Sequence, residues 1–516
     1  MTNKLNNGLV KSVSLSPPTL QDNTADADRL INSLKQQLNT DDIKTDLYLI
    51  REVPELLRKW DYSAECVLIK ERNRWNLIGL AEPKGNSVIS GLAVDLGTTT
   101  VVVRLIDLST GNTLKETSFN NPQISVGPDV LARIHYSEQD GGLEKLNSLI
   151  IGSLNETISA LCSSLGMEKE DIYLLSVAGN TAMTHLFLDL NPYWIIREPY
   201  IPVVNNPGIL RADELGIDVN RLARILVFPN IGSYFGGDLI SGILYSGLNM
   251  SDDASILVDV GTNAEVVLGN NNWLIACAGA AGPALEGGVT KMGMMAGPGV
   301  IDQVEIDADT YEFRIHTIDD MKPRGICGSG LIDLAANLFL TGMIDIRGKL
   351  VKSKCGERYL RKEDLDHLVV VSGDMSSSGK DLTITQADLD SLVRSKAAMY
   401  TILKTITSSV GMDLSDISTF YVAGTFGSYI RPESAISIGM IPDLPLERFK
   451  VLGNSSLGGA TMALLSSDAV EEIEKIRDSI TYIELNVNQE FMQRFSAAKF
   501  LPHTDPTLFP SVKINV

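Results

Sequence analysis

Cysteine is scarce in this chain. Only five of its 516 residues are cysteine, they are scattered, and no pair has Cys-x-x-Cys spacing. An odd and scattered set excludes a disulfide framework and provides no zinc or iron–sulfur site, because such sites need several thiolates close together. The five histidines show no ligand spacing either. We therefore expect each cysteine to be a small buried residue.

Long apolar runs and positive charge are also lacking. One of the longest apolar stretches, residues 90–103, is interrupted by Asp, Gly and Thr well short of the ~18 residues of a membrane helix. Residues 1–10 lack the apolar core of a signal peptide. The formal net charge of −20 would repel a nucleic-acid backbone. These features predict a cytoplasmic protein that binds neither membranes nor nucleic acids.

A buried apolar strand that ends in Asp and turns through Gly-Thr occurs twice, in residues 91–100 and 255–264. Each copy places a carboxylate, Asp95 or Asp259, at the tip of the strand, where small residues let N–H groups and hydroxyls approach a phosphate. One such turn is more often an ordinary turn between core strands, but two copies favour a nucleotide site. Both Asp residues are predicted to hold magnesium, and one of them could orient the attacking water. The predicted phosphate-binding residues are Gly97, Thr98, Thr99, Thr100, Gly261, Thr262 and Asn263.

A second repeat pairs residues 163–179 with residues 408–424. Each copy has the pattern of a helix end, a turn, a buried strand and a Val-Ala-Gly loop. Each half of the chain thus carries the Asp hairpin first and this element later, which indicates duplication of one α/β unit. The spacing between the two motifs is longer in the second half by about 80 residues. We place this insertion at about 285–370 and expect it to be lid-like or to carry specificity.

Further loops are candidates for the same site. Residues 422–427 follow a buried strand, and Gly424, Thr425, Phe426 and Gly427 would let an adenosine lie against the backbone. Gly328 and Ser329 precede a helix and could bind an anion there, although helix packing explains such glycines equally well.

Three charged residues have alternative interpretations. Glu286, in a Gly-rich loop, is a candidate for catalysis. Glu265 is either a solvated strand residue, which we favour, or a residue that orients water. Lys396 could reach a nucleotide, but its position on a helix favours a solvated side chain.

The chain is predicted to contain four parts. Residues 1–24 are polar, contain Pro17-Pro18 and are predicted to be a linker. Residues 25–87 combine two predicted helices, at 26–38 and 51–60, with a hairpin of strands at 64–70 and 75–80, and form a small α/β domain. Residues 88–250 and 251–516 are the two halves, each beginning with a three-stranded meander.

The three loops resemble those of the actin-like ATPase superfamily. Asp95–Thr100 is similar to its first phosphate motif, Asp259–Asn263 to its second and Ala423–Gly427 to its adenosine motif. The resemblance implies an α/β fold of duplicated actin-like, ribonuclease H-like halves around a nucleotide cleft. Other segments are similar to the reductive activators of corrinoid-dependent enzymes, namely residues 121–123, 127–134, 177–183, 229–232, 236–238, 280–288 and 325–330.

The narrower resemblance implies a function. Such activators use ATP and Mg²⁺ to promote the reduction of an inactive Co(II) corrinoid protein to Co(I), in the corrinoid-dependent methyltransferase systems of anaerobic metabolism, and a homodimer is expected. These proteins usually carry a ferredoxin-like iron–sulfur domain ahead of the linker, whereas here nothing precedes the linker. We expect either a truncated chain or a separate ferredoxin as the electron donor, because no residue of this chain can carry an electron by itself.

Two other classes share the nucleotide loops. A small-molecule kinase would transfer phosphate from ATP to an added sugar or carboxylate, and a nucleotide-gated scaffold would bind ATP without turnover. Activators of dehydratase radical enzymes are nearer relatives, but their bridging cluster needs closely spaced cysteines, which this chain lacks.

Overall fold

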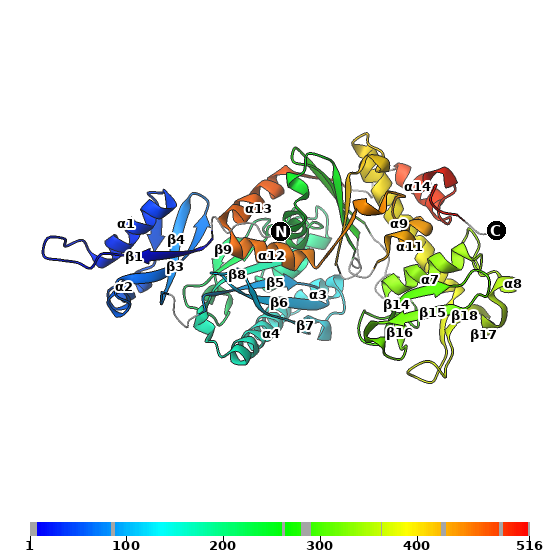
Figure 1. The fold of residues 1–516 in the computed structure, drawn as a ribbon, viewed down its shortest axis with the longest axis horizontal. Helices are drawn as coiled ribbons and strands as arrows, with labels where there is room; N and C mark the ends of the chain where they lie inside the picture. Colours follow the sequence, from blue (N-terminus) through cyan, green and yellow to red (C-terminus); the bar gives the residue numbers. More distant parts are fainter. Residues whose placement is uncertain are drawn as a thin grey trace. The chain divides into compact units, whose positions relative to one another are not determined.

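The computed structural model describes residues 8–83, 88–260, 264–279, 290–362, 364–424, 430–483 and 489–513. The chain forms two compact units (Figure 1). Unit 1 contains Met1–Tyr245 and Ser455–Ser479, and unit 2 contains Ser246–Asn454 and Ile480–Val516. In the described part of the chain, no helix has both the length and the apolar character needed to cross a membrane.

The N-terminal part of unit 1 is a four-stranded sheet covered by two helices. The strand order is β1-β3-β4-β2. Helix α1 is amphipathic and buries Leu30 and Leu34, which confirms the first predicted helix. The second helix and the predicted hairpin are confirmed as well. The elements are β1 (Val10–Ser14), α1 (Asp26–Leu38), β2 (Ile43–Thr45), α2 (Leu47–Lys59), β3 (Ser63–Glu71) and β4 (Arg74–Ala81).

Strand β1 lies within the segment predicted to be a linker. It pairs with β3 in antiparallel register from Val10↔Val67 to Ser14↔Ser63. Leu9 and Val13 are buried at 2% and 3% exposure, so the strand contributes to the core of the small domain. Five residues with one inward side chain are too short a pattern to distinguish from a polar linker, which is why the sequence prediction failed for residues 10–14.

The larger sheet of unit 1 has the order β7-β6-β5-β8-β10-β9. Strands β5, β6 and β7 form the predicted meander, and β8 runs parallel to β5, with Ala178 beside Asp95. All eight residues of β8 are buried, as expected of a central strand. The elements are β5 (Ser90–Leu96), β6 (Thr100–Asp107), β7 (Thr113–Asn120), α3 (Val130–Ser137), α4 (Gly142–Leu165), β8 (Ile172–Gly179), α5 (Thr181–Phe187), β9 (Gly208–Arg211), β10 (Arg224–Val227) and α6 (Gly237–Ser246).

Unit 2 repeats this arrangement with the strand order β21-β20-β11-β12-β13-β22. The meander is β11 (Ser255–Val260), β12 (Ala264–Gly269) and β13 (Leu274–Gly279), and β20 (Thr419–Ala423) runs parallel to β11. In each unit, the strand parallel to the one that carries Asp95 or Asp259 follows a 24-residue helix. This helix is α4 in unit 1 and α9 (Gln386–Ser409) in unit 2. The duplicated actin-like fold is therefore confirmed. The remaining elements of this sheet are β21 (Phe449–Gly453) and β22 (Ile480–Tyr482).

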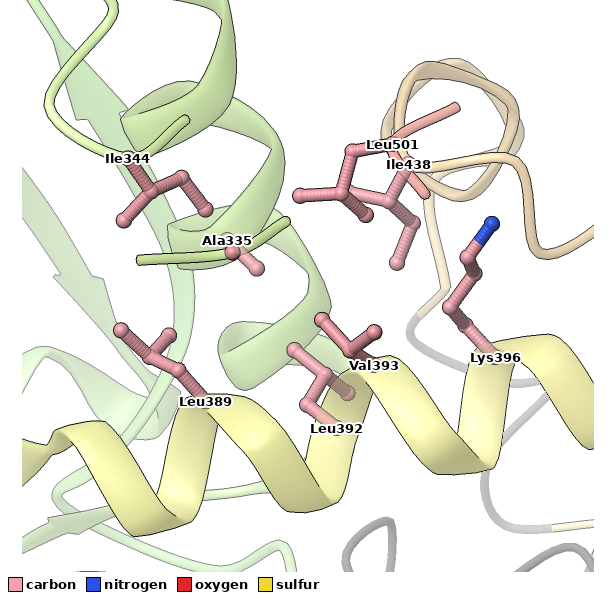
Figure 2. Close-up of a pocket in the computed structure, with 9 residues that line it drawn as sticks. Ala335, Ile344, Leu389, Leu392, Val393, Lys396, Ile438 and Leu501 are labelled. Carbon is pink, nitrogen blue, oxygen red and sulfur yellow. The ribbon is translucent and has the colours of Figure 1, made fainter. Parts of the chain in front are cut away.

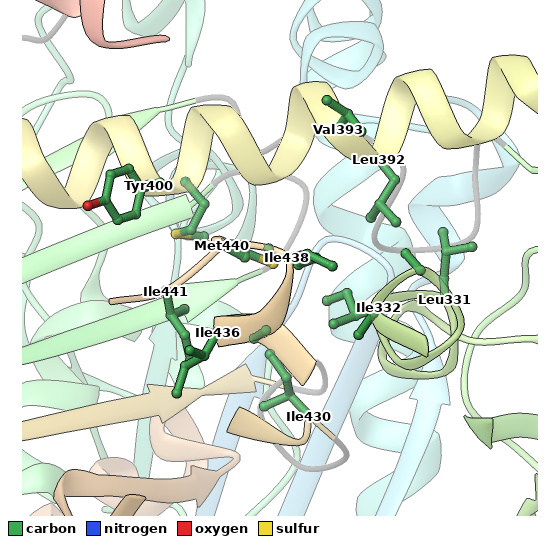
Figure 3. Close-up of a cluster of buried hydrophobic side chains, with 14 of the residues drawn as sticks. Leu331, Ile332, Leu392, Val393, Tyr400, Ile430, Ile436, Ile438, Met440 and Ile441 are labelled. Carbon is green, nitrogen blue, oxygen red and sulfur yellow. The ribbon is translucent and has the colours of Figure 1, made fainter. Parts of the chain in front are cut away.

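Residues 300–385 add two small sheets to unit 2, with orders β15-β14-β16 and β17-β18-β19, and the last strand, β19, lies beyond the predicted insertion at about 285–370. They share one hydrophobic core with the main sheet, in which Val304 and Phe339 join Val258 and Val266. Figure 3 shows part of this core, where side chains of α7, of α9 and of residues 430–441 meet. The elements are β14 (Val300–Ile306), β15 (Phe313–Thr317), β16 (Gly325–Ile326), α7 (Gly328–Leu340), α8 (Lys352–Cys355), β17 (Tyr359–Lys362), β18 (Leu365–Val371) and β19 (Leu382–Thr385).

Two helices from late in the chain belong to unit 1. Helices α12 (Ser455–Leu465) and α13 (Ser467–Ser479) lie in the part of residues 251–516 that the sequence assigned to the second half. Helix α12 packs on β5 and β8, and the Ser241 hydroxyl of α6 donates to the carbonyl of Ser456 at 2.6 Å. Unit 1 is thus built from two separate stretches of the sequence.

Candidate functional site

Asp95 occupies the position predicted for a phosphate-site carboxylate. It lies near the end of β5, between Val102 of β6 and Ala178 of β8, and is partly buried. The hydroxyl of Ser456, on α12, donates to Asp95 Oδ1 at 2.8 Å. Ser456 is 6% exposed, so this contact orients the carboxylate from inside unit 1. No pattern in the sequence links these two residues, which are 361 positions apart.

A second carboxylate, Asp238, lies in the first turn of α6 and faces the same place. Its Oδ1 accepts from its neighbour's amide, Leu239 N–H, at 2.9 Å. Burial and the negative charge of Asp95 raise the pKa of Asp238 to about 7. Two neighbouring carboxylates, one of which titrates near neutral pH, are typical of catalytic sites. The sequence analysis named Asp238 only within residues 236–238 and assigned it no role. A single acid at the start of an apolar helix is the signal that could have identified it.

The loop after Asp95 is held through its carbonyl groups. The side-chain amide of Asn121 donates to Gly97 O at 2.9 Å, and the backbone N–H of Asn121 donates to Thr99 O at 2.8 Å. Arg133 Nη2 donates to Thr98 O at 2.7 Å. Because a trans peptide directs each N–H away from the preceding carbonyl, the N–H of Thr98 points away from the Asn121 side chain and the N–H of Thr99 points away from Arg133. Successive N–H groups on one side of a turn form a concave anion site.

Arg133 is a buried support for this loop. Besides Thr98 O, its guanidinium donates to Gly127 O at 2.9 Å and to Gln123 Oε1 at 3.3 Å. Burial lowers the pKa of Arg133 to about 10, which still leaves it charged at neutral pH. The side chain has 0% exposure and cannot itself reach a ligand in solution. Arg133 therefore positions the loop.

Asn180 supports the loop from the neighbouring strand. It follows β8 and caps α5, where its Oδ1 accepts from Met183 N–H at 2.9 Å. Its amide nitrogen donates to Thr98 Oγ1 at 3.0 Å. Because the hydroxyl of Thr98 accepts this hydrogen bond, its own proton remains available for a phosphate oxygen. Thr99 is exposed and Thr100 begins β6.

Asp259 occupies the corresponding place in unit 2. It lies on β11 between Glu265 of β12 and Ala423 of β20. Gly424 follows with φ +80°, and a Cβ there would lie 2.6 Å from Asp259 Oδ1, so only glycine fits. Asp259 and Glu265 are directly opposed on antiparallel strands and therefore lie on one face, where like charges favour a bound cation. Both interpretations of Glu265 stay open.

Several predicted site residues lie outside the described residues. They are Gly261, Thr262, Asn263, Glu286, Thr425, Phe426 and Gly427. Their roles stay predictions.

The glycines in the first turn of α7 serve packing in part. A Cβ on Gly330 would lie 2.4 Å from Ile301 O, so this residue lets α7 approach β14. Ser329 is 6% exposed and its hydroxyl lies 3.1 Å from Cys327 Sγ. These contacts favour the packing interpretation for Gly330, and the predicted anion contacts of Gly328 and Ser329 stay a prediction.

Lys396 is not the solvated residue that the sequence suggested. It is fully buried on α9, and its ammonium group donates to Gly439 O, Phe500 O and Pro502 O at 3.3, 2.7 and 2.6 Å. Figure 2 shows its side chain beside Ile438 and Leu501 in a small apolar pocket. The helical pattern placed Lys396 correctly on a helix, but it could not show that the chain's last segment covers it. Lys396 therefore has a structural role.

Burial without a neighbouring carboxylate lowers the pKa of Lys396 well below 10.5. Between this lowered pKa and about 10.5 the unfolded chain binds more protons, so the free energy of unfolding rises with pH in this window. We expect the stability difference between wild type and Lys396→Met to grow from pH 7 to pH 10, by at most about 1.4 kcal/mol per pH unit. Urea unfolding at several pH values measures it. Lys404→Met is the control, because Lys404 lies on the same helix and its substitution removes only an ion pair with Asp413, which follows the helix. A difference that stays flat or falls would refute the prediction.

The described cysteines are buried and separate, which confirms the expectation for Cys66, Cys162, Cys277, Cys327 and Cys355. No group of three or more His, Cys, Asp or Glu side chains within the described ranges could hold a metal ion. Mg²⁺ in phosphate-transfer sites needs only one or two carboxylates, with substrate phosphates and waters as its other ligands. The oxygen donors and the negative charge around Asp95 fit this requirement.

Comparison with known proteins finds one family along almost the whole chain. The family model described as the C-terminal domain of RACo, the ASKHA domain, matches residues 253–513, the RACo middle region matches 90–251, and the RACo linker region matches 10–86.

Relatives of known activity agree with these matches. The chain is 30% identical to the corrinoid activation enzyme RamQ of Eubacterium limosum, over 87% of this chain and 79% of that protein. It is 26% identical to the Co(II) methylated amine-specific corrinoid protein reductase of Methanosarcina barkeri, over 76% of this chain and 73% of that protein. The solved structure of a reductive activator for corrinoid, iron–sulfur protein superposes with a TM-score of 0.88 at 40% identity, and covers 99% of this chain and 82% of that one.

Proposed function

The chain belongs to the RACo family, and from this membership we propose that it catalyses the ATP-dependent reductive activation of a corrinoid protein. The corrinoid protein in its inactive Co(II) state is the substrate and its Co(I) state is the product. The observation that carries the chemistry is the pair Asp95 and Asp238 beside a loop whose carbonyl groups are held by Asn121 and Arg133.

The chain's own residues would hydrolyse ATP as follows. The N–H groups of Thr98 and Thr99 and the hydroxyl of Thr98 bind phosphate oxygens. Arg133 and Asn180 hold Thr98 in place through its carbonyl and its hydroxyl. Water attacks the γ-phosphorus, the bond to the ADP oxygen breaks, and Asp238 accepts the proton of the water. A pKa of about 7 suits this task, because a base works best when its pKa lies near the working pH.

Magnesium would be held by Asp95 in unit 1 and by Asp259 in unit 2, directly or through water. When bound, Mg²⁺ neutralises phosphate charge as the transferred group leaves. The Ser456 hydroxyl keeps the Asp95 carboxylate oriented toward the loop. Glu286 stays a proposed participant from outside the described residues.

ATP serves to overcome an unfavourable reduction. The Co(II)/Co(I) couple has a low potential, and for one electron ~59 mV corresponds to about 1.4 kcal/mol. Weakening an axial ligand of cobalt by a few kcal/mol would bring the couple within reach of cellular donors. ATP can drive this change only if it favours a state of the activator that binds the corrinoid protein differently.

The electron must come from an iron–sulfur group that the described residues do not provide, since their cysteines are buried and separate. We propose a ferredoxin-type donor, either a separate protein or a domain attached to this chain. A homodimer is likewise proposed from family analogy.

Visible absorption of a Co(II) corrinoid protein tests the function. The protein is mixed with this chain and a chemical reductant, with and without Mg-ATP. ATP-dependent appearance of Co(I) is the expected result. Absence of any ATP effect on the spectrum or on nucleotide turnover would contradict the proposal and lead to a screen for kinase activity.

Asp238→Asn tests the base. We expect ATP turnover to fall at least ~10-fold and to lose the rise with pH near 7 that deprotonation of Asp238 gives the wild type. Since the pKa is raised, wild-type stability falls as pH increases from about 4 to about 7, whereas the variant should not show this fall. Initial rates and urea unfolding from pH 5 to 9 measure both effects.

Asp213→Asn is the matched control, because Asp213 is a carboxylate of unit 1 that pairs with Arg211 at the surface. It should leave the rate and its pH dependence unchanged. An Asp238→Asn variant that keeps the wild-type pH profile would remove Asp238 from the mechanism.

A further inference from the structure

One short segment of this acidic chain is strongly basic. Residues 347–362 carry seven Lys and Arg and one Glu, whereas the whole chain has a net charge of −20. The segment lies in unit 2, within the predicted insertion, and contains α8 and β17 (Figure 1). Six of its seven basic side chains are exposed, namely Arg347, Lys349, Lys352, Lys354, Arg361 and Lys362. We call these six residues the basic patch.

Aromatic rings hold two of these cations in place. Lys352 Nζ lies 5.0 Å from the centre of the Tyr359 ring, and Lys354 Nζ lies 5.6 Å from that of Tyr311 and donates to its hydroxyl at 3.0 Å. Beneath the patch, Arg358 stacks on Phe313 at 4.2 Å. A ring attracts and orients a cation without cancelling its charge.

Few carboxylates neutralise the patch. Lys349 pairs with Asp390 at 2.7 Å and Arg361 with Asp364 at 3.8 Å. Within the described ranges, no carboxylate lies within 4.0 Å of the other four cations, Arg347, Lys352, Lys354 and Lys362. The patch is therefore only partly neutralised, by these two pairs and by the charge of Asp366 near Lys352.

Apolar side chains are interleaved with these cations. Ile346, Leu360 and Leu365 are 51%, 42% and 43% exposed. Exposed apolar side chains and Arg are characteristic of protein interfaces, whereas Lys, which supplies four of the six cations, is depleted there. A nucleic acid is negative along its whole length and would be repelled by the large negative charge of the remaining surface, whereas a protein can carry negative charge only where it meets the patch. The mixture favours an acidic protein as the partner.

We propose that the basic patch binds an acidic surface of the corrinoid protein. The inference rests on the proposed function, which brings this protein to the activator in every cycle. Opposite charges on two proteins accelerate their encounter and fix its orientation, and salt weakens both effects. The patch thus raises the affinity for the substrate protein without taking part in ATP hydrolysis.

The test is the KM for the Co(II) corrinoid protein in the ATP-dependent Co(I) assay. A variant with R347E, K352E, K354E and K362E should raise this KM at least ~10-fold at low salt, with kcat within two-fold and basal ATP turnover unchanged. The wild-type KM should rise with KCl, and that of the variant should not. The same four positions changed to Gln should give an intermediate KM, which guards against a folding defect of the reversed charges.

The matched control reverses four exposed cations of unit 1 outside the patch, by K44E, K59E, R72E and K145E, so that the net charge changes equally. The proposal is overturned if the wild type is active and both variants raise the KM equally, or neither variant raises it. Patch-dependent binding of an RNA or DNA oligonucleotide, or of a second copy of this chain, with an unchanged KM for the corrinoid protein also overturns it. A wild type with no ATP-dependent Co(I) would instead overturn the proposed function.

Discussion

Asp95→Asn is expected to lower ATP turnover and ATP-dependent Co(I) formation by about three orders of magnitude. The substitution keeps the size of the side chain and its ability to accept a hydrogen bond from the Ser456 hydroxyl, but it removes the negative charge proposed to bind Mg²⁺. It also removes the neighbouring charge that helps to raise the pKa of Asp238, so the remaining activity should reach its plateau at a lower pH. Initial rates as a function of pH measure both effects.

Asp107→Asn provides the comparison for Asp95. Asp107 ends β6 and caps an exposed turn, where its Oδ1 accepts from Ser109 N–H at 2.8 Å. This variant should keep wild-type turnover. If Asp95→Asn retained more than about a tenth of the wild-type rate while folding normally, Asp95 would not be the metal carboxylate of the site.

Arg133→Met has the largest effect expected on stability. It leaves Thr98 O, Gly127 O and Gln123 Oε1 buried without their donor, which should lower the free energy of unfolding by about 3–5 kcal/mol. Because Thr98 O would no longer be fixed, the KM for ATP should also rise several-fold in the folded fraction. Urea unfolding and turnover at several ATP concentrations measure the two effects.

Arg104→Met tests whether burial is the cause. Arg104 also lies in unit 1 but pairs with Glu116 at a partly exposed position, so its loss should cost about 1 kcal/mol or less. Equal losses of unfolding free energy for the two variants would show that burial does not increase the contribution of the hydrogen bonds of Arg133 to stability.

Local patterns in the sequence predicted most of the fold. The strand before Asp95 and the strand before Asp259 are apolar runs that end at an acid, and the helix–turn–strand repeat recurs at both Val-Ala-Gly loops. These features depend on residues close together in the chain. β1 was missed because Val10–Ser14 becomes a strand only by pairing with Ser63 to Val67, about fifty positions later.

The site was only partly predictable for the same reason. Ser456 reaches Asp95 across 361 positions of sequence, and no periodicity encodes such a contact. Arg133 and Lys396 carry charges, which predicts exposure, yet both are buried because backbone carbonyls surround them. Asp238 gains its significance from its nearness to Asp95, which only the folded chain creates.

The two-part construction of unit 1 bears on biosynthesis. During translation, the Asp95 loop leaves the ribosome 361 residues before Ser456 on α12. An unfinished chain thus holds the phosphate loop without the hydroxyl that orients its carboxylate, and the sheet of unit 1 lacks the cover of α12. Contacts so distant in sequence slow folding and expose apolar surface meanwhile. The surroundings of Asp95 are therefore complete only after α12 has been made, 361 positions beyond Asp95.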